Sequence, residues 1–258
     1  MNIPKTCVVL LALMLAAMAI VPCVSALDDG TGQAFQEKSI QTVQHSMNID
    51  SSAPQMSQEE FRNYVQEMSA KYGSENVKAL RSMSGEPDTI QGITYVGAWT
   101  DHLSNTAASA DCALILYKFN QADSSGRDHY YYWQWTSAQP NAWWDLTNFW
   151  NKNQLTNGNS RVITYSPGST ITGNGVTVNV GLSAGYGGMG FTIGGPFTLM
   201  QNTVRPKPGE CSTGYGGKYT VEWTGLYSNP QEIKGAMHVD IPQGQSLTST
   251  WTNSVSGL

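Results

Sequence analysis

Apolar residues change their spacing along the chain near residue 90, and the change divides the chain into two parts. Between residues 61 and 68 they recur at the three- and four-residue spacing of one helix face. An S-x-x-E capping box at residues 57–60 precedes this run, and Gly73 ends it. The pattern predicts an amphipathic helix, followed by a shorter helix that begins at Ser74.

After residue 90 apolar positions alternate with polar ones, and clusters of Gly, Pro, Asn and Ser separate the alternating stretches. A period of two predicts β-strands, and short strands with no helical stretch between them predict antiparallel sheets. We expect a mainly β fold: an antiparallel β-sandwich, jelly-roll or Ig-like, over residues 91–258, with a small N-terminal helical extension over residues 55–90. Residues 142–150 fit a strand or a short helix. The predicted strands are 93–96, 112–119, 129–136, 161–165, 176–186, 219–227, 233–241 and 246–251.

The first 26 residues have the pattern of a secretory signal peptide. One Lys precedes an almost wholly apolar stretch over residues 7–21, and small residues follow at 24–26. The stretch is shorter than the about 20 residues of a membrane-spanning helix. We expect a secreted, extracellular protein that begins near Leu27. Residues 27–54 are polar without a sustained period and predict a flexible arm, and the segment 55–90 is a candidate propeptide.

The composition narrows the classes of partner. Charged residues make up 13% of the chain, about half of their share in ordinary soluble domains, and the formal net charge is −5. Lys and Arg form no cluster, so we expect no nucleic acid partner. The sequence has no dinucleotide or phosphate-binding fingerprint and no metal-binding motif, so we expect no cofactor and no metal.

Two cysteines remain after removal of the signal peptide, because Cys7 and Cys23 lie within it. In an oxidising compartment an even number of cysteines favours a disulfide. We predict a bond between Cys112 and Cys211. It would close a loop of about 100 residues and stabilise the fold by about 4–5 kcal/mol in the chain-entropy model.

Aromatic residues are concentrated in residues 130–150, which makes this segment the candidate for a ligand-binding surface. On a strand, Tyr131, Trp133 and Trp135 lie on one face, and the tyrosines between and before them lie on the other. Exposed rings are common at interfaces, and carbohydrate or another extracellular protein is the expected partner. The alternative is that a second sheet and the N-terminal helix cover both faces. The candidate binding residues are Tyr130, Tyr132, Trp133, Trp135, Trp143, Trp144 and Trp150.

The leading interpretation is a secreted binding or interaction protein without catalytic activity. A secreted polysaccharide-acting hydrolase is one alternative, and it needs two carboxylates about 5–9.5 Å apart across a cleft. Nothing in the local sequence marks such a pair. Glu222 alternates with apolar neighbours on a predicted strand and is therefore expected to face solvent. The available carboxylates are Glu210, Glu222, Glu232, Asp145 and Asp240.

A second alternative comes from residues 176–193. Apolar and polar residues alternate from Val176 to Tyr186, two glycines can turn the chain, and the alternation resumes at Met189. The pattern predicts a hairpin with one apolar and one polar face, whose first arm has about the 9–11 residues of a membrane-spanning strand. A β-hairpin pore-forming protein inserts such a hairpin, although Pro196 predicts an early end of the second arm. Membrane insertion is thus the less favoured alternative, beside an ordinary sandwich hairpin.

Overall fold

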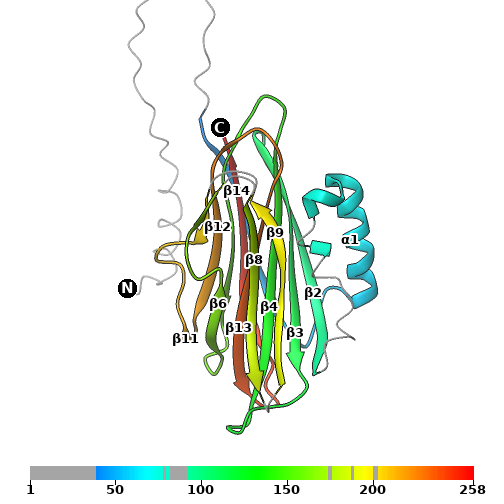
Figure 1. Cartoon of the computed structure of the whole chain (residues 1–258), viewed down its shortest axis with the longest axis vertical. Helices are drawn as coiled ribbons and strands as arrows, with labels where there is room; N and C mark the ends of the chain where they lie inside the picture. Colours follow the sequence, from blue (N-terminus) through cyan, green and yellow to red (C-terminus); the bar gives the residue numbers. More distant parts are fainter. Residues whose placement is uncertain (1–38, 78–79, 82–91, 174–175, 187–188, 200–202) are drawn as a thin grey trace, which may run out of the picture. The chain divides into compact units, whose positions relative to one another are not determined.

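The computed structural model describes residues 39–258 except 78–79, 82–91, 174–175, 187–188 and 200–202. The predicted signal peptide and the start of the predicted arm lie outside the described residues. Most described strands belong to two six-stranded antiparallel sheets, which we call sheet A and sheet B (Figure 1). In order across the sheet, sheet A contains β1 (Gln41–Asp50), β14 (Thr248–Gly257), β5 (Leu146–Leu155), β12 (Lys218–Tyr227), β10 (Thr203–Pro206) and β7 (Ile171–Thr172).

Sheet B is also antiparallel, and a third sheet has only two strands. In order, sheet B contains β11 (Gly214–Tyr215), β6 (Arg161–Ser166), β13 (Gln231–Pro242), β4 (Arg127–Pro140), β3 (Ala108–Phe119) and β2 (Ile93–Ser104). The third sheet is the hairpin of β8 (Val176–Tyr186) and β9 (Met189–Leu199).

Sheets A and B pack face to face around the main core. Ser249 of β14 donates a hydrogen bond across the core to the Tyr132 hydroxyl of β4, at 3.2 Å. Gly235 of β13 lies at a close approach of the sheets, since a Cβ there would lie 2.8 Å from the Tyr219 ring and 2.9 Å from Val221, both of β12. The predicted mainly β fold of antiparallel strands is confirmed.

Residues 41–50, predicted to belong to a flexible arm, form the edge strand β1. All ten residues pair with β14, from Gln41 opposite Gly257 to Asp50 opposite Thr248. Ile49 is buried, whereas most other side chains of β1 are exposed or half-buried. The arm prediction is wrong for these residues, because a largely exposed edge strand carries a weak apolar period.

The helix α1 (Gln58–Tyr72) begins at the predicted capping box. The Ser57 hydroxyl accepts from the Glu60 amide at 3.3 Å, and the Glu60 carboxylate accepts from the Ser57 amide at 2.7 Å. Both bonds satisfy amides at the helix start that have no partner within the helix. The second predicted helix begins at Ser74 but is a short 3-10 helix, η1 (Ser74–Val77).

Asp111 of β3 docks α1 against sheet B. Its buried carboxylate accepts from Lys71 Nζ at 2.6 Å and from the Tyr72 hydroxyl at 2.5 Å, and it lies 2.7 Å from His102 Nδ1. Burial raises the pKa of Asp111, but these bonds outweigh it and lower the pKa below its usual value. The helical segment is therefore packed on the sheet. Its removal as a propeptide stays a prediction.

The two cysteines are free thiols, so the predicted disulfide is not formed. Cys112 is buried in β3 of sheet B, where the Thr136 hydroxyl donates to its Sγ at 3.4 Å. Cys211 lies between β10 and β11 and accepts from the Thr220 amide of β12, in sheet A, at 3.4 Å. The sequence gives the number of cysteines but not their separation in space.

Candidate functional site

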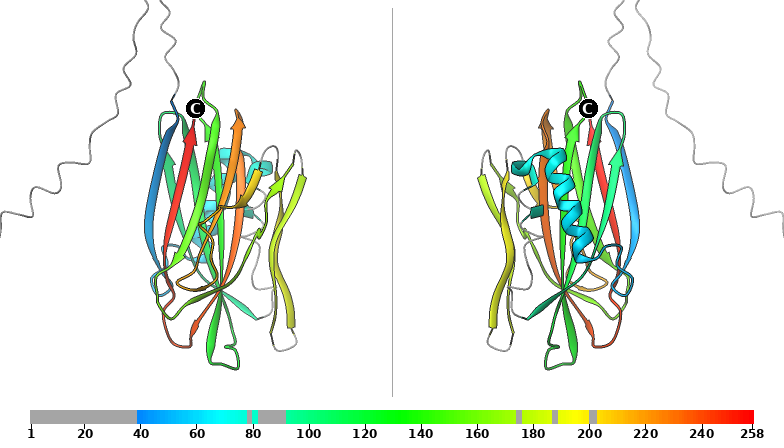
Figure 2. Two further views of the ribbon diagram at one scale, coloured as in Figure 1. Left: turned by 90° about the vertical axis from the view of Figure 1, so that its left-hand side faces the viewer. Right: turned by 90° about the vertical axis from the view of Figure 1, so that its right-hand side faces the viewer.

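The hairpin β8–β9 is the part of the fold that belongs to neither large sheet. Its strands pair with each other over their full length, from Val176 opposite Leu199 to Tyr186 opposite Met189. They form no ladder with sheet A or sheet B. Both strands lie against β13, and β8 also lies against β6. Figure 2 shows the hairpin as a separate layer beside sheet B.

The sequence alternation and the register of the hairpin agree. Apolar residues stand opposite apolar ones in one row, with Gly195 as the exception, and small or polar residues stand opposite each other in the other row. The apolar row pairs Val176 with Leu199, Val178 with Phe197, Val180 with Gly195, Leu182 with Ile193, Ala184 with Phe191 and Tyr186 with Met189. The polar row pairs Thr177 with Thr198, Asn179 with Pro196, Gly181 with Gly194, Ser183 with Thr192 and Gly185 with Gly190.

Each arm of the hairpin has 11 residues. The second arm does not stop at Pro196 as predicted: it continues to Leu199, because a strand with only one ladder partner tolerates a residue that lacks an N–H group. The sequence contains no Asp, Glu, Lys, Arg or His between Arg161 and Arg205. The hairpin is thus long, amphipathic and without charge.

The hairpin is anchored at the edge of sheet A. β7 precedes it and β10 follows it, and these two strands pair through Ile171 with Val204 and Thr172 with Thr203. β10 in turn pairs with β12, where Thr203 stands opposite Thr224. The hairpin therefore connects Thr172 to Thr203, which are cross-strand partners. A change in its position need not break a ladder of sheet A.

The Thr172–Thr203 and Ile171–Val204 pairs, which we call the anchors of the hairpin, lie at the same end of sheet A as an exposed tryptophan. Leu146 of β5 stands opposite Tyr227 of β12 and Gly257 of β14 at this end. Trp143, three residues before Leu146, is 91% exposed and has a φ of 72°, a left-handed conformation that is unfavourable for a bulky side chain. Leu226 is 59% exposed. Two large apolar side chains thus meet solvent at the end of sheet A where the hairpin begins and ends.

The predicted binding surface of residues 130–150 is mostly buried. Tyr130, Tyr132, Trp133 and Trp135 are each at most 5% exposed, which overturns their assignment as a ligand surface. Trp144 and Trp150 are partly buried, and of the seven only Trp143 is exposed. The rings are covered because β4 is an inner strand of sheet B with elements packed on both of its faces.

Two faces of sheet B can be distinguished from the register. Gly235 faces sheet A, so its neighbours in β13, Lys234 and Ala236, lie on the other face. We call this the outer face of sheet B. It also carries the residues of β4 that stand beside them in the ladder. Its residues in β4 and β13 are His129, Tyr131, Trp133, Trp135, Glu232, Lys234, Ala236, His238 and Asp240. The hairpin lies against β13, and α1 lies against β2, at the side of the same sheet.

Lys234 is a cation buried on the outer face. It is 0% exposed, and its Nζ lies 4.2 Å from the centre of the Trp133 ring. Burial lowers the pKa of Lys234 to about 8, although Glu232 acts in the opposite direction. Glu232 also accepts a hydrogen bond from Trp135 Nε1 at 2.5 Å. This charge lies on the strand that the hairpin contacts.

Two histidines are paired further along the outer face. His129 Nδ1 lies 2.9 Å from His238 Nε2, and the His238 ring stacks on the Tyr131 ring at 4.5 Å between centres. Burial, and then the charge of His129, lower the pKa of His238 to about 4, although Asp240 opposes the shift. His129 Nε2 also lies 3.3 Å from Asp123.

Asp123, His129 and Asp240 offer ligand atoms within 4.8 Å of one another. However, Arg127 and Arg161 both bond to the Asp240 carboxylate. The two guanidinium groups already neutralise the carboxylate that a cation would need. We therefore assign this cluster to an ion-pair network and not to a metal site.

Two of the carboxylates considered for a hydrolase, those of Glu222 and Glu210, are held by other groups. Glu222 is 5% exposed instead of solvent-facing and accepts from Arg205 at 3.0 Å and from Asn148 at 3.0 Å. Glu210 accepts from Lys218, and ion pairs with Lys152 and Lys218 lower its pKa to about 2. Glu210 is therefore not placed as the protonated acid that glycoside hydrolysis requires.

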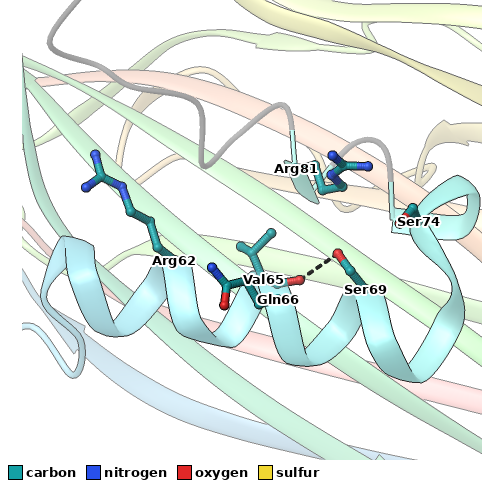
Figure 3. Close-up of a pocket in the computed structure, with 6 residues that line it drawn as sticks. All are labelled: Arg62, Val65, Gln66, Ser69, Ser74 and Arg81. Atoms are coloured by element: carbon teal, nitrogen blue, oxygen red, sulfur yellow. Dashed lines mark hydrogen bonds between the residues drawn. The ribbon is translucent and has the colours of Figure 1, made fainter.

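A pocket lies between α1 and residues 74–81 (Figure 3). Among the described residues that line it are two guanidinium groups, and none of these lining residues is a carboxylate, His or Cys. The lining residues are Arg62, Val65, Gln66, Ser69, Ser74 and Arg81.

Comparisons with models of protein families and with curated proteins find no match. Among solved structures, similar ones include a "Pore forming protein" (TM-score 0.37, 9% identity, covering 62% of this chain and 80% of that chain) and Clostridium perfringens delta-toxin (0.39, 9%, 64% and 81%). The Clostridium perfringens NetB toxin in its membrane-inserted form is a third (0.28, 9%, 64% and 86%). None of the helices among the described residues could span a bilayer.

Proposed function

We propose that this protein is a secreted pore-forming protein whose hairpin β8–β9 leaves the outer face of sheet B and enters a membrane. The observation that carries the proposal is the hairpin itself. It is a separate two-stranded sheet without charged residues, with one apolar and one polar row in register. Secretion rests on the N-terminal sequence pattern.

The dimensions of the hairpin suit a bilayer. Eleven residues at about 3.3 Å each give arms of about 36 Å, and a tilted membrane strand needs about 9–11 residues. In a membrane barrel the apolar row would face lipid and the polar row would face the lumen. A lone hairpin leaves backbone groups unpaired at both edges, which is costly in hydrocarbon. Several copies must therefore close one barrel, so the proposal includes oligomerisation.

The anchors define which end of the molecule meets the membrane. The hairpin begins and ends beside the Thr172–Thr203 pair, at the end of sheet A that carries Trp143 and Leu226. A hairpin that swings away about these anchors extends beyond that end. Trp is favoured at the membrane–water interface. The exposed tryptophan therefore supports membrane contact, whereas a sugar-binding surface of buried rings has no support.

The two rows of the hairpin provide a matched test. Leu182 belongs to the apolar row, opposite Ile193, and the next residue, Ser183, belongs to the polar row. A Lys on the lipid face of a membrane strand costs about 2–4 kcal/mol near the bilayer centre. We expect Leu182→Lys to lower dye release from phosphatidylcholine vesicles at least tenfold. Ser183→Lys should retain dye release and shift the pore toward anion selectivity.

Circular dichroism and tryptophan emission in solution serve as the folding control for both variants. Equal dye release by the two variants would contradict the assignment of the rows. A wild-type protein that binds vesicles at high concentration without releasing dye would contradict the pore itself.

A further inference from the structure

We propose that the His129–His238 pair is a proton-operated latch for the hairpin: an added proton on the pair loosens the hairpin from β13. The inference rests on the proposed function, because it names how the same hairpin is regulated. Three features carry it: the contact between the two rings, their burial on the outer face, and the position of the hairpin against β13.

The contact between the two rings has room for only one hydrogen between the two nitrogens. At 2.9 Å, His129 Nδ1 and His238 Nε2 share a hydrogen bond in which one nitrogen donates and the other accepts through its lone pair. A proton added at the accepting nitrogen removes this acceptor, makes one imidazole a cation and leaves two N–H groups facing each other. His238 is 9% exposed, stacks on the Tyr131 ring and has the tilted Phe119 ring 6.3 Å away, so water solvates the added charge poorly.

The carboxylates near the pair are those of Asp123 and Asp240. From the chain before β4, Asp123 faces His129. From β13, Asp240 is present, but Arg127 of β4 and Arg161 of β6 are bound to it. β4 adds the Tyr131 ring, and β3 adds the Phe119 ring. The hairpin brings no Asp, Glu, Lys, Arg or His, and its titratable side chain is Tyr186.

The hairpin is the element best placed to yield. It has no ladder hydrogen bonds to sheet A or sheet B, whereas His129 and His238 lie in paired inner strands. In the proposed open state the hairpin no longer lies against β13, the strand of His238, so water can solvate a charged imidazole there. Acid therefore favours release of the hairpin without unfolding of the sheets.

The sign of the pH dependence follows from linkage. A histidine whose pKa is lowered in the closed state binds fewer protons there than in the open state, so the closed state loses stability as pH falls. The burial of His238 places this loss between about pH 6.5 and 4. Each pH unit inside the window changes the open-to-closed ratio by up to about tenfold.

Hydrogen–deuterium exchange of the whole protein in water, corrected for intrinsic rates, measures the latch without a membrane. We expect protection of amides 176–199 to fall about tenfold between pH 6.5 and 5 in the wild type. His238→Phe keeps a ring on Tyr131 and cannot be protonated, so its hairpin protection should stay within twofold. His238→Gln is a second variant, in case the bulkier ring disturbs packing. His45→Gln, at an exposed site on β1, should behave as the wild type.

Hairpin protection that does not change with pH in the wild type would overturn the latch. An unchanged loss of protection at acid pH in both His238 variants would also overturn it. Loss of protection across all strands at once would overturn it too, since it would show global unfolding. Dye release from phosphatidylcholine vesicles at pH 7.4 and 5.5 separates the two proposals. Acid-dependent protection without dye release supports the latch and counts against the pore. Dye release with flat protection supports the pore and counts against the latch.

Discussion

Lys234 shows what one buried charge contributes to this fold. Its ammonium group is 0% exposed and lies over the Trp133 ring. A cation–π contact compensates for only part of the cost of removing an ammonium group from water. The lowered pKa expresses the remaining cost.

Lys234→Met should remove one pH dependence of stability. The folded protein releases the Lys234 proton near pH 8, whereas the unfolded chain keeps it until about pH 10.4, so the unfolded state binds more protons in between. The wild-type free energy of unfolding should therefore rise between pH 8 and 9.5, by at most about 1.4 kcal/mol per unit. Urea unfolding at three pH values measures this rise. An equally steep rise in the methionine variant would disprove the assignment.

The sequence predicted which aromatic residues share a face but not what covers them. Alternation along β4 separates Tyr131, Trp133 and Trp135 from Tyr130 and Tyr132. Their burial depends on elements more than 40 residues away in sequence, such as β13, which pairs with β4 along its whole length. Trp143 could be found only from its place in a turn, because no pattern distinguishes it from the buried rings.

At the scale of elements, the signals that succeeded are local. The capping box predicted the start of α1, and the alternation over residues 176–193 predicted the hairpin. The arm prediction failed at β1, where few apolar residues mark the strand. Residues 142–150 fitted two structures because their apolar residues suit both periods, and the strand β5 begins only at Leu146.

Asp111 of β3 joins α1 to sheet B through hydrogen bonds from Lys71 and Tyr72. Asp111→Ala removes the acceptor of Lys71 and Tyr72 and leaves a buried hydroxyl without this partner. We expect a loss of about 1–3 kcal/mol of stability and faster proteolysis within α1. Glu67→Ala, at an exposed position of the same helix, is the control and should change neither quantity. A helix that remains equally protected in the aspartate variant would show that apolar contacts alone dock it.

At the scale of the whole molecule, sequence patterns gave antiparallel sheets but not their strand order. β1 pairs with β14, at the other end of the chain, and β13 lies between β4 and β6. Such pairings depend on packing between distant segments, which one sequence does not display. The cysteine pairing failed for the same reason, since the two thiols lie in separate surroundings.

The orientation of the molecule at a membrane can be tested with two exposed aromatic residues. Trp143 lies at the end with the hairpin anchors, and Tyr215 of β11, 65% exposed, lies beside Arg161 and Arg127, away from it. We expect Trp143→Ala to weaken binding to phosphatidylcholine vesicles about tenfold, which corresponds to about 1.4 kcal/mol. Tyr215→Ala should leave binding unchanged in the same flotation assay. If Tyr215→Ala weakened binding and Trp143→Ala did not, the opposite end of the molecule would be the one that contacts the membrane.

The hairpin also governs the solubility of the resting molecule. While it lies against β13 and β6, it covers part of the outer face of sheet B. A molecule that lost this cover in bulk solution would present adhesive surface and tend to precipitate. A molecule that lost this cover on a crowded membrane would meet mainly other copies of the protein in the same orientation. The hairpin thus protects the soluble molecule from aggregation. Its release at the membrane confines self-association to the place where a barrel can be completed.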